Sequence, residues 1–265
     1  MKISVIGLGW YGKVLANELS ATHTMSGTKS TLEGVKNWND NSVSAHYLNL
    51  NEEFDYSRLK LVFDVDCLVV NIPPSAAKSV PYSVQMEKIL KGIKKYKASH
   101  VIFISSTGVF GEHQLEVDED TTPEPTRGNG EVLLRAENYF VEHFAGRVSI
   151  IRPGGLVGED RHPVKYLAGR ERVSGKDHPV NLVHRKDLIA LTHFLIENIT
   201  ARSCFHAVAT EHPSKKAYYR AVAEEKRLEK PQFDEADTSH GKLILGDKTQ
   251  TETIGFEFND PFDMV

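Results

Sequence analysis

The sequence has few of the residues and runs that mark secreted, membrane-bound or disulfide-rich proteins. Its 265 residues include only two cysteines, Cys67 and Cys204, which lie far apart in apolar surroundings. Their spacing predicts no disulfide framework and fits a reducing compartment. No stretch approaches 18 consecutive apolar residues, and the apolar run after Met1 is shorter than the hydrophobic region of a signal peptide. We therefore expect a cytoplasmic protein that does not contact the membrane.

An excess of positive charge and the common metal-ligand spacings are missing too. The formal net charge is −4, which supplies no basic surface for nucleic acid. The twelve histidines are not accompanied by Cys-x-x-Cys or His-Glu-x-x-His spacings. We expect neither a nucleic-acid partner nor a metal site. With 40% hydrophobic and 26% charged residues, the composition is that of a globular protein that can bury a sizeable core.

Short apolar runs alternate with longer amphipathic stretches along the chain. This alternation is typical of a doubly wound parallel sheet whose strands are buried on both faces by helices. We predict an α/β fold of Rossmann type, a single dinucleotide-binding domain over 1–265, with a small C-terminal substrate lobe from 155–180 and 205–265. The predicted strands are Lys2–Gly7, Thr22–Gly27, Ser44–Leu48, Cys67–Ile72, His100–Ser105, Arg147–Arg152 and Cys204–Val208, with a terminal strand at Gly255–Phe258. The predicted helices are Gly12–Leu19, Tyr82–Tyr96, Gly130–Phe144, Arg185–Asn198 and Lys215–Lys226, and Tyr218 and Tyr219 are expected to be core residues.

A glycine-rich turn follows the first predicted strand. Residues 7–12 read Gly-Leu-Gly-Trp-Tyr-Gly, a G-x-G-x-x-G motif at the start of a predicted helix. The first glycine permits a tight turn, the second lets the backbone approach a pyrophosphate, and the third allows close packing of helix on strand. The N–H groups of the helix N-terminus favour negative charge. The motif predicts a dinucleotide site formed by Gly7, Gly9, Trp10, Tyr11 and Gly12.

The residues after the second predicted strand bear on the choice of dinucleotide. NAD enzymes of this fold end that strand in Asp or Glu, which accepts a hydrogen bond from the ribose 2′-hydroxyl. Here Thr28, Lys29 and Ser30 follow, so that no acid repels a 2′-phosphate and a lysine with two hydroxyls can hold one. We predict NADP rather than NAD, with an ordinary exposed loop lysine at position 29 as the alternative.

Residues at two further strand ends should border the same cofactor. The segment after the third strand lies where such folds cradle the adenine, and the turn after the fourth strand lies at the carboxyl edge of the sheet. The predicted contacts are Asn49, Leu50, Asn71, Ile72 and Pro73.

Three later segments, taken in order, resemble one family. Residues 105–111, Ser-Ser-Thr-Gly-Val-Phe-Gly, resemble the S-S-x-x-V-Y-G segment of extended short-chain dehydrogenases, the group of the nucleotide-sugar epimerases and dehydratases. Residues 151–158, Ile-Arg-Pro-Gly-Gly-Leu-Val-Gly, resemble their L-R-P-x-x-x-Y-G stretch, and residues 183–188, Val-His-Arg-Lys-Asp-Leu, resemble their V-H-V-x-D-L. The resemblance implies cofactor contacts from Ser105, Pro153 and Gly154, and a homodimer formed through the two long helices predicted at 82–96 and 130–144.

The chain departs from this family at the catalytic pair. Counting back from Glu137, which matches the glutamate of the family's Y-G-x-S-K-x-x-x-E pattern, places Asn129 at the tyrosine and Leu133 at the lysine. A tyrosine needs a nearby lysine charge to act as a base around neutrality, and asparagine cannot take a proton. Ile6 also stands where the first glycine of the usual G-x-x-G-x-x-G would fall. The resemblance is therefore to an atypical branch that lacks the active-site tyrosine.

Two functions agree with these features. In the first, the protein is an oxidoreductase or epimerase/dehydratase-like enzyme on a small or nucleotide-sugar-like substrate. Ser106 is then the catalytic candidate, because it matches the family's residue that hydrogen-bonds the reacting carbonyl or hydroxyl. In the second, the protein binds NADP(H) without turnover and reports redox state to a partner. Substitutes for the missing acid or base are Thr107, Arg127 and Glu131, and Arg161 and His162 either hold an anionic substrate or belong to a solvated loop.

Overall fold

A computed structural model describes residues 1–76, 79–126, 128–198 and 203–265. The chain falls into two compact units, each assembled from separate segments. Unit 1 contains Met1–Ser105, Gly128–Ile151 and Thr192–Cys204, and unit 2 contains Ser106–Arg127, Arg152–Leu191 and Phe205–Val265. The segments 155–180 and 205–265, expected to form the substrate lobe, lie in unit 2.

A seven-stranded parallel sheet forms the centre of the fold, which confirms the predicted Rossmann-type architecture. The strand order is β10-β7-β5-β4-β1-β2-β3, with β1 in register between β2 and β4. All seven predicted sheet strands are present, and their ends differ from the predicted ones by at most two residues. Their bounds are β1 (Lys2–Ile6), β2 (Thr24–Lys29), β3 (Val43–Tyr47), β4 (Cys67–Val70), β5 (His100–Ile104), β7 (Val148–Pro153) and β10 (Cys204–Ala207).

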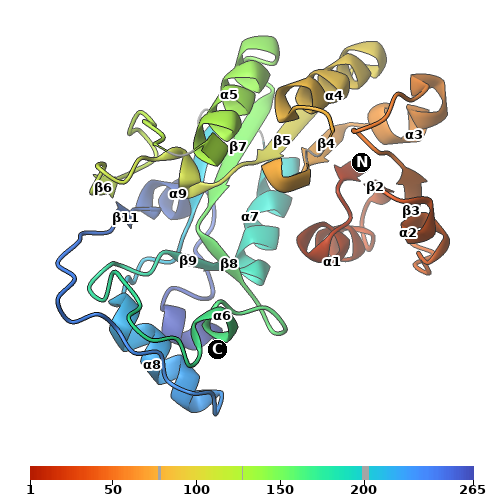
Figure 1. Ribbon diagram of the computed structural model, residues 1–265. Helices are drawn as coiled ribbons and strands as arrows, with labels where there is room; N and C mark the ends of the chain where they lie inside the picture. Colours follow the sequence, from red (N-terminus) through yellow and green to blue (C-terminus); the bar gives the residue numbers. More distant parts are fainter. Residues whose placement is uncertain (77–78, 127, 199–202) are drawn as a thin grey trace. The chain divides into compact units, whose positions relative to one another are not determined.

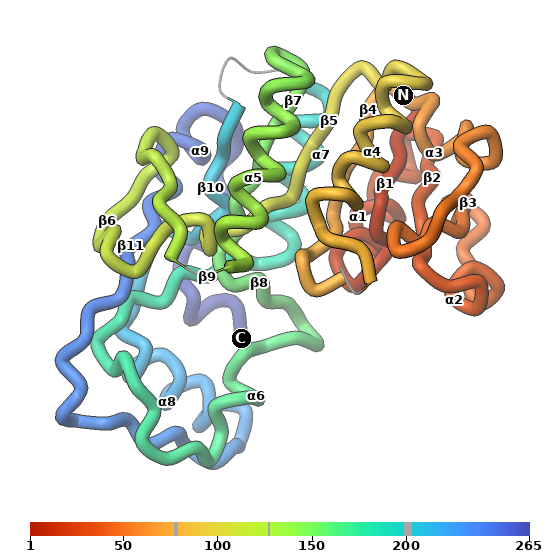
Figure 2. The backbone as a smooth tube through the Cα atoms, turned by 45° about the horizontal axis from the view of Figure 1, so that its top comes forward, coloured from red at the N-terminus to blue at the C-terminus, as the bar shows by residue number. Residues whose placement is uncertain are grey.

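Helices cover both faces of the sheet in unit 1 (Figures 1 and 2). On one face lie α3, α4 and α5, and on the other lie α1 and the C-terminal part of α7. Every residue of β4 and β5 is buried, as expected of strands covered on both sides. The helices of the sheet are α1 (Trp10–Leu19), α2 (Leu32–Lys36), α3 (Lys60–Phe63), α4 (Tyr82–Tyr96), α5 (Gly128–His143) and α7 (Arg185–Glu197).

Unit 2 has a core of its own around α8. Tyr218 and Tyr219 of α8 are buried there, which confirms their predicted place in the core. Two small parallel sheets complete the unit, one of β6 with β11 and one of β8 with β9. The elements are β6 (Glu116–Val117), β8 (Gly155–Val157), α6 (Val164–Leu167), β9 (Leu182–His184), α8 (Lys215–Glu225), β11 (Leu243–Ile244) and α9 (Asp247–Glu252).

The predicted terminal strand at Gly255–Phe258 is wrong, because this segment is not in a strand. The carboxylate of Asp187 accepts the backbone N–H groups of Glu257 and Phe258, at 2.8 and 3.2 Å. Burial raises the pKa of Asp187, while these two hydrogen bonds act against the rise. The Asp187 carboxylate therefore accepts the backbone N–H groups that a neighbouring strand would otherwise have accepted.

Two expectations about the whole chain can be compared with the structure. Cys67 and Cys204 do not form a disulfide with each other, and Cys67 is buried. Among the described residues, no helix has the length and apolar character that crossing a bilayer requires.

Packing of α4 on α3 depends on a glycine. A Cβ at Gly92 would lie 2.5 Å from Cε1 of Phe63, a fully buried ring. We expect Gly92→Ala to destabilise the protein by about 1–3 kcal/mol, because overpacking forces the ring or the helix to move. Gly128→Ala in α5 is the matched control, since a Cβ there meets no described atom within 4 Å. Urea unfolding of both variants measures the difference, and equal stability of the two would contradict this account of the packing.

Candidate functional site

The glycine-rich turn joins β1 to α1 in unit 1. Gly7 has a φ of +107°, and a Cβ there would lie 2.3 Å from the carbonyl oxygen of Asn71. A Cβ at Gly12 would lie 2.2 Å from the carbonyl oxygen of Gly7. Neither distance leaves room for a side chain, so positions 7 and 12 accept only glycine for steric reasons.

Gly9 is a glycine for a different reason. It is exposed and stands at the N-cap of α1, with no side-chain cap among the described residues. No described atom lies within 4 Å of where its Cβ would be. The protein itself does not require a glycine here, whereas a ligand that packs against the backbone would. The open side of Gly9 at the positive end of a helix fits a pyrophosphate.

Two residues that we predicted as cofactor contacts hold this turn in place. The hydroxyl of Thr28 accepts the Gly7 N–H at 3.1 Å, and its carbonyl accepts the Leu8 N–H at 2.9 Å. The backbone N–H of Asn71 donates to Ile6 at 3.0 Å, and its side-chain amide approaches the Gly7 carbonyl at 3.4 Å. Thr28 and Asn71 therefore connect the ends of β2 and β4 to the turn.

Positive charge gathers beside the turn. Nζ of Lys29, the last residue of β2, donates to the carbonyl of Leu8 at 2.6 Å and lies 5.0 Å from the centre of the Trp38 ring. Nζ of Lys13 lies 5.8 Å from the same ring. Burial, followed by the charge of Lys13, lowers the pKa of Lys29. Ser30, the next residue, is exposed. The positive charges of the two lysines repel each other, and an anion bound beside them would offset this repulsion.

Side chains at two other predicted positions point into unit 1. The phenol of Tyr11 is buried and lies 2.6 Å from the hydroxyl of Thr192 in α7, where burial strongly raises its pKa. The hydroxyl of Ser105 is also buried and donates to the carboxylate of Glu137 in α5 at 2.5 Å. Tyr11 does not fill the turn, and Trp10 beside it is half-buried. What Tyr11 can offer a ligand is its backbone.

The predicted adenine contacts take part in a local turn. The amide of Asn49 donates to Glu52 at 2.7 Å, and its oxygen accepts the Asn51 N–H at 3.1 Å. Leu50 is buried. After β4, the carbonyl of Ile72 accepts the Tyr82 hydroxyl at 2.7 Å, and Pro73 is exposed.

Ser106 lies at a cavity of about 340 Å³ in unit 2. Its Oγ accepts the N–H of Gly108 at 3.0 Å, which leaves its own proton to donate. The predicted residue Gly154 lies in the wall, whereas Pro153 is buried at the end of β7. The residues that line the cavity are Ser106, Thr107, Gly108, Phe110, Glu112, Thr126, Gly154, Gly155 and Lys242.

Lys242 is a lining residue that the sequence did not reveal, as are Glu112, Thr126 and Gly155. Its Nζ donates to the carbonyl of Phe110 at 2.5 Å and lies 3.9 Å from Glu112. Asn181 fixes the segment that carries it: the Asn181 amide donates to the Lys242 carbonyl at 2.8 Å and accepts the Ile244 N–H at 3.0 Å. No motif surrounds Lys242 in the sequence, so only the fold connects it with Ser106.

The positions expected for the catalytic pair lie in the first turns of α5. Asn129 and Glu131 are exposed, and Leu133 is buried. Arg127, suggested as a substitute acid or base, lies outside the described residues. A buried leucine carries no charge to orient a ribose or to assist a base.

His162, considered as a contact for an anionic substrate, is occupied within the core of unit 2. Its Nδ1 accepts the Val164 N–H at 3.1 Å, so the proton of the ring is on Nε2, which donates to the Tyr218 hydroxyl at 2.8 Å. Burial, with the charges of two lysines, lowers its pKa to about 4. A neutral ring in this position does not attract an anion.

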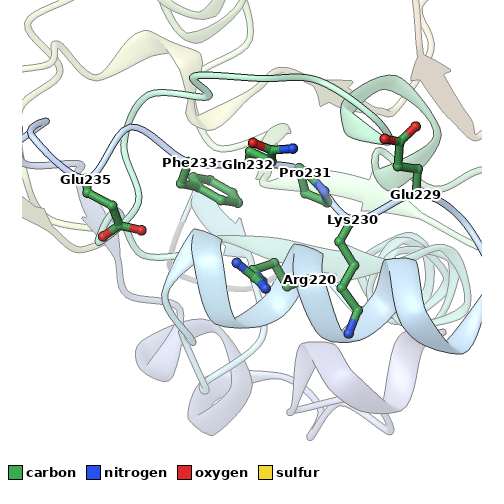
Figure 3. A pocket seen from close by; sticks show the side chains of 7 residues that line it. All are labelled: Arg220, Glu229, Lys230, Pro231, Gln232, Phe233 and Glu235. Atoms are coloured by element: carbon green, nitrogen blue, oxygen red, sulfur yellow. The ribbon is translucent and has the colours of Figure 1, made fainter.

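A second hollow of about 640 Å³ opens beside α8 in unit 2 (Figure 3). Two of its charged side chains form ion pairs at the surface: Glu235 with Lys216 at 2.5 Å, and Lys230 with Glu224 at 2.7 Å. The lining residues are Arg220, Glu229, Lys230, Pro231, Gln232, Phe233 and Glu235. Because ion pairs at the surface occupy Glu235 and Lys230, we favour the cavity at Ser106 as the candidate substrate site.

The sheet order and the turn at 7–12 define the class: the chain has the fold of the epimerase/dehydratase-type short-chain dehydrogenases. A Methylobacillus flagellatus protein, proposed to be a NAD-dependent epimerase/dehydratase, is 20% identical, with a TM-score of 0.80 over 99% of this chain and 95% of its own. The UDP-glucuronic acid 4-epimerase of Bacillus cereus, solved in complex with NAD, is 16% identical, with a TM-score of 0.76 over 100% and 95%.

Sequence similarity identifies the family more closely. Protein YeeZ of Escherichia coli strain K12 is 32% identical over 272 residues, which cover 100% of this chain and 98% of YeeZ. The chain belongs to the same family as YeeZ. No family model matches it.

The buried His162 should make stability depend on pH. Its pKa is about 4 in the folded state, below the value of about 6.5 in an unfolded chain. The unfolded state therefore binds the proton more readily, and the stabilisation present above pH 6.5 is lost as the pH falls towards 4.

Urea unfolding of the wild type and of His162→Gln at several pH values measures this contribution, because the other titrating groups cancel in the difference. The wild type should be more stable at pH 7, and its advantage should shrink as the pH falls. An advantage that is constant or grows at low pH would show that His162 is not held neutral.

Proposed function

We propose that this protein binds a nicotinamide dinucleotide at the turn from Gly7 to Gly12, and that it prefers NADP. The observation that carries the proposal is Gly9, an exposed glycine at an uncapped helix start that no protein contact requires. A similar fold in the Bacillus cereus epimerase, which was solved with NAD, supports the same assignment. When bound, such a cofactor accepts or donates a hydride.

The preference for NADP follows from charge. The last residue of β2 is Lys29, in the place where a carboxylate would accept from the ribose of NAD. Together with Lys13, whose Nζ also lies near the Trp38 ring, it provides two cations for a 2′-phosphate, and Thr28 and Ser30 add hydroxyls. Burial, and then repulsion by Lys13, lowers the pKa of Lys29, and binding of the phosphate would offset both effects.

We further propose that the cavity at Ser106 receives the substrate of an oxidoreductase or epimerase/dehydratase-like reaction. The Ser106 hydroxyl is placed to donate to a carbonyl or hydroxyl oxygen, since its oxygen already accepts from Gly108. Lys242 brings positive charge to the cavity wall, which stabilises a negative charge that develops on that oxygen. The hydroxyls of Thr107 and Thr126 suit a polar substrate, small or nucleotide-sugar-like.

The second candidate function is a redox sensor that binds NADP(H) without turnover. It is favoured by α5, where an exposed asparagine and a buried leucine occupy the positions of the catalytic pair. A homodimer through α4 and α5, which the family resemblance implies, is compatible with either proposal.

Fluorescence titration with NADPH and NADH tests the cofactor site. We expect tighter binding of NADPH. Gly9→Ala should weaken both dinucleotides by at least tenfold at unchanged thermal stability, because its methyl group meets only the ligand. Lys13→Ala and Lys29→Ala should each weaken NADPH about tenfold, the size of one charged hydrogen bond, and NADH much less.

Lys36→Ala is the control, because Lys36 is an exposed lysine in the last turn of α2. Lys29 also donates to the carbonyl of Leu8 in the turn. If Lys29→Ala loses NADH binding and Lys13→Ala does not, the loss in Lys29→Ala reflects a distorted turn. The effect of Lys13→Ala on NADPH binding then tests the preference for NADP. If the wild type binds neither dinucleotide, the proposed function is wrong.

Oxidation of NADPH by aldehydes and ketones detects an oxidoreductase. Chromatography of sugar nucleotides incubated with protein and cofactor detects an epimerase or dehydratase, which regenerates its cofactor. Together the two assays separate the enzyme from the sensor. With a substrate found, Ser106→Ala should lower kcat/KM about 100-fold, as loss of an oxyanion donor does, while NADPH affinity is retained. Lys242→Ala should act in the same direction. Ser83→Ala, on the exposed side of α4, should leave the rate unchanged. Tight binding of NADPH with no turnover of any substrate would favour the sensor.

A further inference from the structure

Three potential metal ligands meet in unit 1, away from the glycine-rich turn. His23 lies just after the end of α1, and its backbone N–H donates to Leu19 at 2.9 Å. His193 and Glu197 are one turn apart on the C-terminal part of α7, which packs on the same face of the sheet as α1 (Figures 1 and 2). The turn lies at the opposite end of α1, about 15 Å away for a helix of ten residues.

The ligand atoms are spaced as a zinc ion requires. The Nε2 atoms of His193 and His23 lie 3.4 and 3.7 Å from the same oxygen of Glu197. One ligand atom from each residue can be chosen so that all three lie within 4.8 Å of one another. Bonds of about 2.0 Å in a tetrahedral site place neighbouring ligand atoms about 3.3 Å apart. Small side-chain movements would therefore bring the three atoms onto one ion.

The imidazole of His23 packs edge-on against the His193 ring, with the ring centroids 5.8 Å apart, but this contact does not use its nitrogens. Its side chain is 7% exposed, and neither ring nitrogen has a hydrogen-bond partner in the described part of the chain. The buried Nε2 of His193 lacks one as well. Such orphaned polar atoms are costly, and 3.4 and 3.7 Å are too long for good hydrogen bonds to Glu197. Burial also disfavours a charged ring, which weakens the alternative of an ion pair.

We propose that His23, His193 and Glu197 bind a divalent transition-metal ion, with Zn²⁺ as the best match. Two imidazoles and one carboxylate suit zinc, cobalt and nickel, whereas magnesium and calcium prefer oxygen ligands. The side chains of His193 and Glu197 are 42% and 50% exposed, so an ion can enter from solvent and keep water as its fourth ligand. Sequence analysis predicted no metal site because His23 is distant along the chain from the other two.

Titration of tag-free, metal-stripped protein with Co²⁺ and Zn²⁺ tests this site. Visible absorption should show one tetrahedral Co²⁺ per chain, displaced by Zn²⁺, and Zn²⁺ should raise the melting temperature. His23→Ala, His193→Ala and Glu197→Gln should each weaken binding at least tenfold, since even residues behind the ligands contribute about that much. Glu197→Gln changes an exposed residue and should fold normally without metal.

His113→Ala is the matched control, because His113 pairs with Glu124 at 2.9 Å on the surface and no third metal ligand joins them among the described residues. It should bind Zn²⁺ as the wild type does. The dinucleotide titrations should be unchanged in Glu197→Gln, which keeps the metal site separate from the proposed function. Weak, nonstoichiometric binding by the wild type, or equal Zn²⁺ affinity in Glu197→Gln and the wild type, would overturn the proposal.

Discussion

Steric exclusion at the turn between β1 and α1 is the constraint on which the candidate cofactor site depends. The carbonyl of Asn71 excludes a side chain at position 7, and the carbonyl of Gly7 excludes one at position 12. Because the two glycines allow these close contacts, only three residues separate the end of β1 from the start of α1, and Gly9 at the N-terminus of α1 is exposed. Thr28 adds hydrogen bonds from β2, so that three strands determine the shape of a turn of six residues.

The sheet was predictable because each of its strands is specified locally. Runs such as Cys67–Val70 and His100–Ile104 are apolar at nearly every position, as burial on both faces requires. The error at Gly255–Phe258 has a physical cause. An alternating apolar pattern indicates which side chains are buried, and Phe256 is buried, but it does not reveal what accepts the backbone N–H groups. Here the acceptor is the carboxylate of Asp187, on a distant helix.

The candidate site was predictable only where neighbours in sequence form it. The glycine motif carries its geometry within six residues, and Ser106 follows directly from the end of β5. By contrast, Lys242 reaches the cavity through a segment whose position is set by Asn181, and His23 meets His193 and Glu197 only after α1 and α7 have packed. The sequence showed that Thr28 and Asn71 lie at strand ends. It did not show that their side chains point towards the glycine-rich turn.

The hydrogen bonds between Asn181 and residues 242–244 determine which part of the cavity wall can change without moving the backbone. Its side-chain amide bonds Lys242 and Ile244 through main-chain atoms alone, and its main-chain carbonyl accepts the N–H of Gly155 at 2.8 Å. The backbone of this segment is thus fixed independently of which side chain stands at position 242. An exchange of that side chain would give up the hydrogen bond from Nζ to Phe110 but would keep the main-chain hydrogen bonds to Asn181. The charge of the cavity wall can therefore change while the backbone around it keeps its hydrogen bonds.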